Sequence, residues 1–162
     1  MLLRQSVQAG ASLIEVMVAL FVMAIGLLGF AALLTTSSTL NQRAFQLSQA
    51  VFLAESIVER ARANRDSVSN YGITLAQNAT SSGNCDSADC DAATMASWDL
   101  AQWMTQVEGT LPEGDAEITI DTTTTIPIMT VTVYYELREG GKSTGDSALL
   151  GTLENHTLRA EI

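Results

Sequence analysis

One segment near the N-terminus constrains this chain more than any other part of its sequence. Residues 11–34, ASLIEVMVALFVMAIGLLGFAALL, form a run of 24 positions in which Glu15 is the sole ionisable side chain. A helix over this run would extend roughly 36 Å at about 1.5 Å per residue, and the hydrocarbon core of a bilayer is about 30 Å thick. The run therefore predicts a transmembrane helix.

The charges that flank this run predict its orientation. Arg4 precedes the run, and the uncharged residues 35–39, TTSST, follow it. Because positive residues are retained on the cytoplasmic side, the N-terminus is expected in the cytoplasm and the chain after Thr35 outside it. The whole chain has 8 basic and 18 acidic residues, a net charge of −10, which argues against nucleic acid as a direct partner.

Two simpler interpretations of the apolar run explain less. A secretory signal peptide has an apolar core of about 7–15 residues, and although Gly29-Phe30-Ala31 resembles a cleavage site, this run is longer and contains Glu15. A signal anchor accommodates the length but leaves Glu15 without a role. Since a carboxylate inside a membrane span costs a few kcal/mol at its centre and less at its edge, Glu15 either lies among the lipid headgroups or has a function.

Residues 10–16, GASLIEV, resemble the processing signal of type IV prepilins. The resemblance implies that a prepilin peptidase cuts after Gly10 on the cytoplasmic side, and that Ala11 becomes the first mature residue and is N-methylated. It also implies that Glu15, the fifth mature residue, acts in assembly. The chain then divides into a leader (1–10), a transmembrane half-helix (11–34) and a periplasmic head (35–162).

The helix is expected to continue beyond the membrane to about Asn64. Apolar residues recur at alternating spacings of four and three, which is typical of an amphipathic helix, and Phe45 and Phe52 flank this stripe. The stripe consists of Leu40, Ala44, Leu47, Val51, Ala54, Val58 and Ala61. Arg60, Arg62 and Arg65 close the helix, where positive charge complements the helix dipole; a contact with DNA or lipid headgroups is the alternative.

Residues 66–94 are rich in small polar residues and are interpreted as a long loop. Cys85 and Cys90 lie in it, and in an oxidising compartment they would form a disulfide. Two cysteines and one histidine, His156, are too few for a zinc site. Asp86, Asp89 and Asp91 lack the spacing of a calcium-binding loop and are interpreted as solvated, so no metal or cofactor is expected.

The remaining residues predict one helix and three strands. Asp91 could cap a helix over about residues 93–110, ended by Leu111-Pro112-Glu113-Gly114, in which Trp98 and Trp103 are packing residues. Alternating apolar residues predict strands. The expected strands are Ala116–Ile120, Met129–Leu137 and Leu150–Ile162. Antiparallel pairing of these strands over the C-terminal half of the long helix gives an α+β fold, which is the fold of type IV pilins that the resemblance implies.

Further motifs narrow the resemblance within that family. Residues 61–64 (AxAN), the spaced cysteines, residues 99–103 (DLAQW) and residues 111–114 (LPxG) look like those of the minor pilins called PilV. This resemblance implies a non-enzymatic minor pilin that helps to prime assembly of a type IV pilus and sits at or near its tip. The implied partners are prepilin peptidase, the major pilin and other minor pilins, the inner-membrane assembly platform and the lipid bilayer.

Two alternative functions remain open on the sequence. A minor pseudopilin of a type II secretion system shares the same N-terminal helix and processing. A single-span, signal-anchored periplasmic protein is the other alternative, and the lack of a catalytic motif argues against an enzyme of that class. Under the minor-pilin interpretation the protein resides in the inner membrane before assembly and in the surface pilus afterwards.

Overall fold

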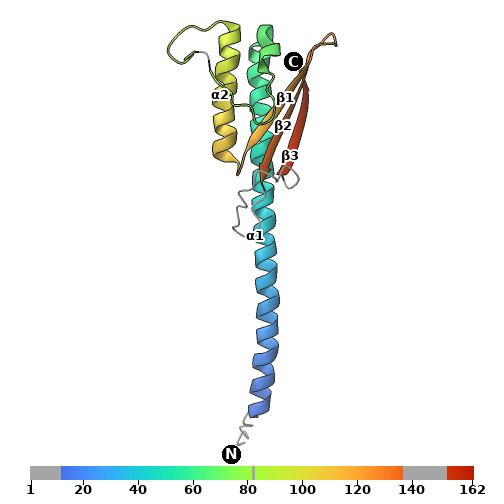
Figure 1. The fold of residues 1–162 in the computed structure, drawn as a ribbon. Coiled ribbons are helices and arrows are strands. Elements are labelled where there is room, and N and C mark those ends of the chain that lie inside the picture. Colours follow the sequence, from blue (N-terminus) through green and yellow to red (C-terminus); the bar gives the residue numbers. More distant parts are fainter. Residues whose placement is uncertain (1–11, 82, 137–152) are drawn as a thin grey trace, which may run out of the picture. The chain divides into compact units, whose positions relative to one another are not determined.

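A computed structural model describes residues 12–81, 83–136 and 153–162 of the chain (Figure 1). The elements follow the order α1 (Leu13–Ala63), η1 (Arg65–Tyr71), α2 (Ala92–Thr110), β1 (Asp115–Asp121), β2 (Ile128–Glu136) and β3 (Leu153–Glu161). The chain forms two compact units, Met1–Asn41 and Gln42–Ile162, and α1 contributes residues to both.

The first unit contains the apolar half of α1. Its described residues are exposed apart from the half-buried Thr39, and no residue in its most apolar stretch is buried. Among the described residues, α1 is the helix long and apolar enough to cross a membrane. An apolar helix surface of this extent needs lipid or other helices around it, as the sequence predicts.

The second unit, Gln42–Ile162, is the folded part of the predicted head and is called the head from here on. It is built on a three-stranded antiparallel sheet in the order β1-β2-β3. Along β2 the side chains alternate between buried and half-buried, because successive residues of a strand point to opposite faces. Figure 1 shows the sheet and α2 against the head portion of α1. The architecture is therefore α+β, as predicted.

Most of the core of the head comes from α1, the sheet and α2, and η1 adds Val68 and Tyr71. The buried positions of α1 are spaced by three and four residues, so they lie on one face of the helix. These positions are Ala50, Leu53, Ala54, Ile57, Val58 and Ala61. The sheet contributes Ala116, Ile118, Met129, Val131, Val133 and Tyr135, and α2 contributes Ala96, Leu100, Trp103, Met104 and Val107. The three alanines of α1 leave room for close packing by the bulkier side chains of the other elements.

The predicted elements agree with the observed ones to within a few residues. Asp91 caps α2, since its Oδ1 accepts a hydrogen bond of 2.7 Å from the backbone N–H of Thr94. Strand β2 begins directly after Pro127, which has no N–H to donate. The predicted strand ends at residues 137 and 150–152 lie outside the described residues.

The prediction of one continuous loop over residues 66–94 was wrong at its start. Residues 65–71 form the 3₁₀ helix η1, which buries Val68 and Tyr71, and Ile73 then forms an isolated antiparallel bridge with Ile118 of β1. These three apolar side chains are spaced too irregularly to indicate an element, and the polar residues between them resemble a loop. Burial against the core compensates for their weak local propensity.

Candidate functional site

Glu15 lies in the first turn of α1 with its side chain exposed. The backbone N–H groups of Glu15 and Val16 donate to the carbonyl of Ser12 at 3.0 and 3.3 Å, so this turn is closed. A carboxylate here complements the positive end of the helix dipole. Among the described residues, no side chain forms an ion pair with Glu15. Gly10 and Ala11, the expected cleavage and methylation site, lie outside the described residues.

The apolar half of α1 exposes apolar side chains around its whole circumference. Large side chains on every side are exposed, among them Leu13, Phe21 and Leu28 at 81%, 68% and 72%. Farther along, the hydroxyls of Thr35 and Thr36 both donate to the carbonyl of Ala32, at 2.8 and 3.1 Å. Because these polar groups are satisfied within the helix, they tolerate an apolar environment.

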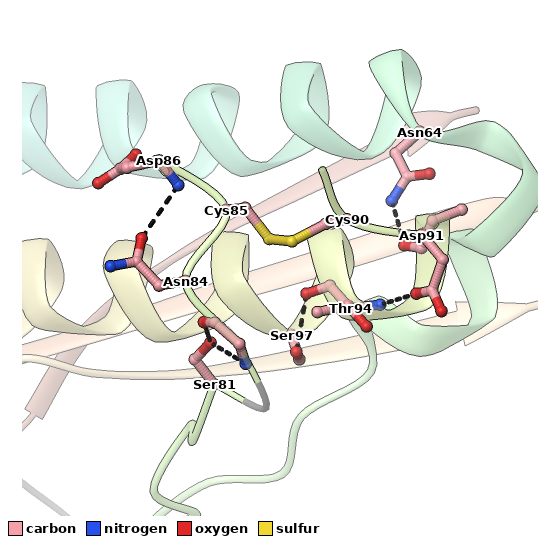
Figure 2. The surroundings of a disulfide bond; sticks show 11 residues. Asn64, Ser81, Asn84, Cys85, Asp86, Cys90, Asp91, Thr94 and Ser97 are labelled. Carbon is pink, nitrogen blue, oxygen red and sulfur yellow. Dashed lines mark hydrogen bonds between the residues drawn. A yellow bond between two sulfur atoms is a disulfide. The ribbon is translucent and has the colours of Figure 1, made fainter. Parts of the chain in front are cut away.

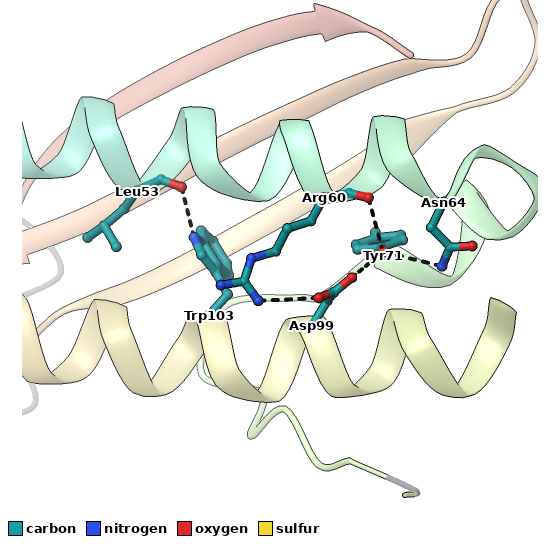
Figure 3. Close-up of polar contacts among 6 residues, drawn as sticks. All are labelled: Leu53, Arg60, Asn64, Tyr71, Asp99 and Trp103. Atoms are coloured by element: carbon teal, nitrogen blue, oxygen red, sulfur yellow. Dashed lines mark hydrogen bonds and ion pairs between the residues drawn. The ribbon is translucent and has the colours of Figure 1, made fainter. Parts of the chain in front are cut away.

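A polar cluster joins α1, η1 and α2 within the head (Figure 3). The guanidinium of Arg60 lies 3.2 Å from Oδ1 of Asp99, and the Tyr71 hydroxyl donates to Oδ2 of Asp99 at 2.6 Å. Asn64 donates to the Ala92 carbonyl at 2.7 Å and to the Tyr71 hydroxyl at 3.3 Å. Burial, together with the hydrogen bond to Asp99, raises the pKa of Tyr71 well above its usual value. The cluster therefore fixes where α2 lies against the end of α1.

Trp103 supplies a second fixed contact between the two helices. Its side chain is fully buried, and its indole N–H donates to the Leu53 carbonyl at 2.8 Å (Figure 3). The prediction that Trp103 is a packing residue is thus confirmed, and Trp98 on the same helix is half-buried. A buried indole with a satisfied N–H is a large contribution to core packing.

The three arginines near the end of α1 have different surroundings. Arg60 and Arg62 lie in its last turn, as predicted, whereas Arg65 begins η1. Arg62 binds Glu59 at 2.6 Å and donates to the carbonyl of Glu161 in β3 at 3.1 and 3.3 Å. Two of the three arginines therefore have protein partners, which favours the structural interpretation of this charge.

A disulfide joins Cys85 to Cys90 in the loop before α2, with their Cα atoms 5.6 Å apart (Figure 2). The loop is held at its end by Asp91, whose pKa is lowered by hydrogen bonds from Thr94. In the parts of the chain described, no three His, Cys, Asp or Glu side chains form a group that could hold a metal ion. The loop is thus a covalently closed surface feature.

We expect the protein purified without reducing agent to contain no free thiol. Closing a loop this short is worth about 2 kcal/mol in the chain-entropy model, so replacing both Cys85 and Cys90 by serine should lower the free energy of unfolding by about that amount. Mass spectrometry after alkylation of the non-reduced protein counts the free thiols. Two alkylated cysteines in the membrane-extracted protein would contradict the prediction.

Sequence reasoning did not identify the partners of Arg60, Tyr71 and Asp99. Arg60 lies 39 positions before Asp99 and Tyr71 lies 28 positions before it, so no local sequence pattern connects them. One signal was present: Asp99 lies among the apolar positions of α2, and a carboxylate there requires a donor.

Comparisons with known proteins yield two matching families. Residues 32–101 match the family described as type IV pilin Tt1218, and residues 5–31 match the prokaryotic N-terminal methylation motif. Together they extend from before Gly10 to within α2. No curated protein and no solved structure matches the chain.

Proposed function

Because the chain belongs to the type IV pilin family, we propose that it is a minor pilin, a subunit of low abundance that helps to prime assembly of a type IV pilus. Proteins of this family are structural subunits and not enzymes. Membership also implies membrane anchorage through the apolar helix, processing by prepilin peptidase and assembly with other pilins. The methylation motif at residues 5–31 is the observation that carries the proposal, since it matters only for a subunit that is processed and assembled.

The motifs that resemble PilV make structural contacts in the head. Asn64 and Asp99 belong to the polar cluster, and Trp103 binds the backbone of α1. In the turn after α2, a Cβ atom at Gly114 would lie 2.5 Å from the Val107 carbonyl oxygen, so this position requires glycine. Because these motif residues hold the head together, they support a head architecture like that of the PilV minor pilins. This in turn supports the assignment as a PilV-like minor pilin.

In the proposed cycle the protein first resides in the inner membrane. The leader is cytoplasmic, residues 11–34 span the bilayer, and residues 35–162, which include the head, are periplasmic. After cleavage it joins other minor pilins and the major pilin on the assembly platform, at or near the pilus tip. Glu15 and the new N-terminal ammonium of a neighbouring subunit pair in the filament, because two charges that are costly alone in an apolar core are tolerable together.

Deletion of the gene distinguishes this function from the pseudopilin alternative. Loss of surface pili, with protein secretion unchanged, is expected for a minor pilin. Loss of secretion with normal piliation would assign the protein to a type II secretion system. Restoration by the wild-type gene controls for effects on neighbouring genes.

We expect the mature protein to begin at Ala11. Intact mass of the membrane-extracted protein should equal that of residues 11–162, raised by one methyl group if Ala11 is N-methylated. Gly10→Ala should be processed at a moderately reduced rate, whereas Gly10→Leu should accumulate as precursor, because the bulky side chain occupies the cleavage position. A mature chain that starts at Met1 or after Ala31 would refute this assignment.

A further inference from the structure

The outer edge of β1 is covered by a short segment of the same chain. Residues 73–77, here called the strap, follow η1 and run beside β1. Ile73 forms an antiparallel bridge with Ile118, in which each N–H donates to the other residue's carbonyl, at 3.1 and 2.8 Å. Because backbone groups alternate in direction along a strand, Ala116, Ile118 and Ile120 all direct theirs away from β2. The strap lies where a further strand would pair.

Asp115 fastens the far end of the strap to the sheet. Its Oδ2 accepts a hydrogen bond of 2.9 Å from the backbone N–H of Ala76. Its Oδ1 accepts one of 2.7 Å from the outward N–H of Ala116. One carboxylate therefore holds the strap and occupies a donor of the β1 edge. While the strap is closed, neither Ala116 nor Ile118 offers a free N–H to a partner strand.

Few contacts hold the strap closed. Ile73 is its one buried side chain, and among the described residues the side chain of Gln77 bonds to Thr74, within the strap itself. Ala76 has a φ of 59°, a left-handed conformation that is unfavourable for a residue with a Cβ atom. Ala76 and Gln77 also border an open hollow that α2 lines, so this part of the strap is not packed on that side. The strap can therefore leave β1 by breaking the Ile73 contacts and the Asp115 bond, with the β1-β2 ladder intact.

We propose that the strap opens separately from the sheet, and that, when latched by Asp115, it prevents β1 from pairing with β1 of a second copy of this chain. An unpaired strand edge is a template for another chain. β1 is seven residues long and contains no proline, so without the strap its edge would be free to pair. Pilins assemble with other pilins, which brings their heads together, so a guard on this edge keeps unwanted strand pairing from competing with assembly.

The sequence of β1 is compatible with such self-pairing. Antiparallel pairing of two copies centred on Ile118 sets Glu117 opposite Thr119, which is not a like-charge pair. The same register sets Asp115 opposite Asp121, and carboxylates directly opposite each other repel. Asp115 therefore opposes pairing in two ways, as the latch of the strap and through its charge. The two contributions are separable by mutation.

Hydrogen exchange tests whether the strap opens separately. The Ile118 amide donates to the strap, whereas the register directs the adjacent Thr119 amide to β2, so the two amides report on different openings. In the detergent-extracted full chain, we expect Ile118 to exchange about tenfold faster than Thr119. Asp115→Ala should accelerate Ile118 by about a further tenfold, as expected for loss of a hydrogen bond to a charged group, and leave Thr119 within about twofold.

Gln77→Ala is a second variant that changes no residue of the sheet. It removes the two hydrogen bonds that the Gln77 side chain accepts from Thr74, and it keeps every charge. Ile118 should exchange about threefold faster in this variant, with Thr119 unchanged. Glu117→Ala is the matched control for Asp115→Ala, since it removes a carboxylate from the same strand without touching the strap. It should leave the exchange of Ile118 within about twofold of wild type.

Self-association tests the guarding role. In sedimentation velocity of the detergent-extracted chain, Asp115→Ala should shift towards dimer at a concentration where the wild type does not. Asp121→Asn is the control, because it removes the same opposing charge, keeps an oxygen for the Thr123 N–H and leaves the latch intact. It should sediment as the wild type does. Association through the apolar half of α1 is common to all three proteins and cancels in the comparison.

Three results would overturn the proposal. The first is equal exchange at Ile118 and Thr119 in the wild type and in both strap variants, which would mean that strap and sheet open together. The second is an Asp115→Ala protein that opens faster yet associates no more than the wild type. The third is equal association of Asp121→Asn and Asp115→Ala, which would assign the effect to charge alone. None of these measurements involves pili, so their outcome is independent of the proposed function.

Discussion

Replacing Glu15 by alanine should leave the protein in the membrane and cleaved, yet remove it from pili. Loss of a carboxylate from an apolar helix makes insertion easier, so targeting should not suffer. Assembly should fail, because the N-terminal ammonium of a neighbour would be left unpaired in the filament core, and breaking such a pair costs roughly 3–5 kcal/mol. The expected reduction in sheared pili is more than about tenfold, measured against the amount in the membrane fraction.

The control for this experiment is Val16→Ala, which changes the next exposed residue of the same helix and keeps the charge. It should enter pili in nearly normal amounts. If Glu15→Ala is found in pili at the wild-type level, Glu15 does not have the assembly role assigned to it. If the variant is missing from the membrane, the defect is in targeting or folding, and the assembly hypothesis loses its support.

The parts of the fold that sequence predicts well are those determined by local patterns. The apolar run predicts α1 because its length and composition fit a membrane. The alternation from Met129 to Tyr135 predicts β2. Asp91 predicts the start of α2, because the N–H that it caps belongs to Thr94, only three positions further along the chain. Each of these signals lies within one element, so no knowledge of the tertiary structure is required.

The parts that sequence does not predict depend on distant partners. η1 forms because Val68 and Tyr71 are covered by other elements, and the Tyr71 hydroxyl in turn needs Asp99 of α2 to accept its hydrogen bond. From the sequence, Gly114 is an ordinary turn residue, and only the structure shows that the Val107 carbonyl leaves no room for a Cβ atom there. In both cases the deciding contact joins residues whose proximity the sequence pattern does not reveal.

The candidate site at Glu15 likewise has one part that the sequence predicts and one part that depends on a distant partner. Glu15 is recognised from its place in a short motif, and the structure adds that the carboxylate is exposed at the start of α1. Its proposed partner belongs to another subunit, so neither the sequence nor the fold of one chain contains the complete charge pair. This is why the test of Glu15 must be carried out on assembled filaments.

Within the head, Trp103→Ala should produce the largest loss of stability. The side chain is fully buried between α1 and α2, and removing an indole from such a position typically costs 3–5 kcal/mol, a large share of the roughly 5–15 kcal/mol that stabilises a domain. Trp103→Phe should cost less, because it keeps an aromatic ring in the core but loses the hydrogen bond of 2.8 Å to Leu53.

Trp98→Ala is the matched control, since it removes the same side chain from a half-buried position on the same helix. Urea unfolding of the detergent-extracted chains, followed by circular dichroism, measures the free energy of unfolding for all three variants. The expected order of destabilisation is Trp103→Ala, then Trp103→Phe, then Trp98→Ala. Equal losses at positions 98 and 103 would mean that α2 is not held to α1 mainly through Trp103. If destabilisation follows this order, the Trp103 and Trp98 variants should enter pili in proportion to the fraction of each that is folded. Glu15→Ala should instead be lost from pili although its head is fully stable.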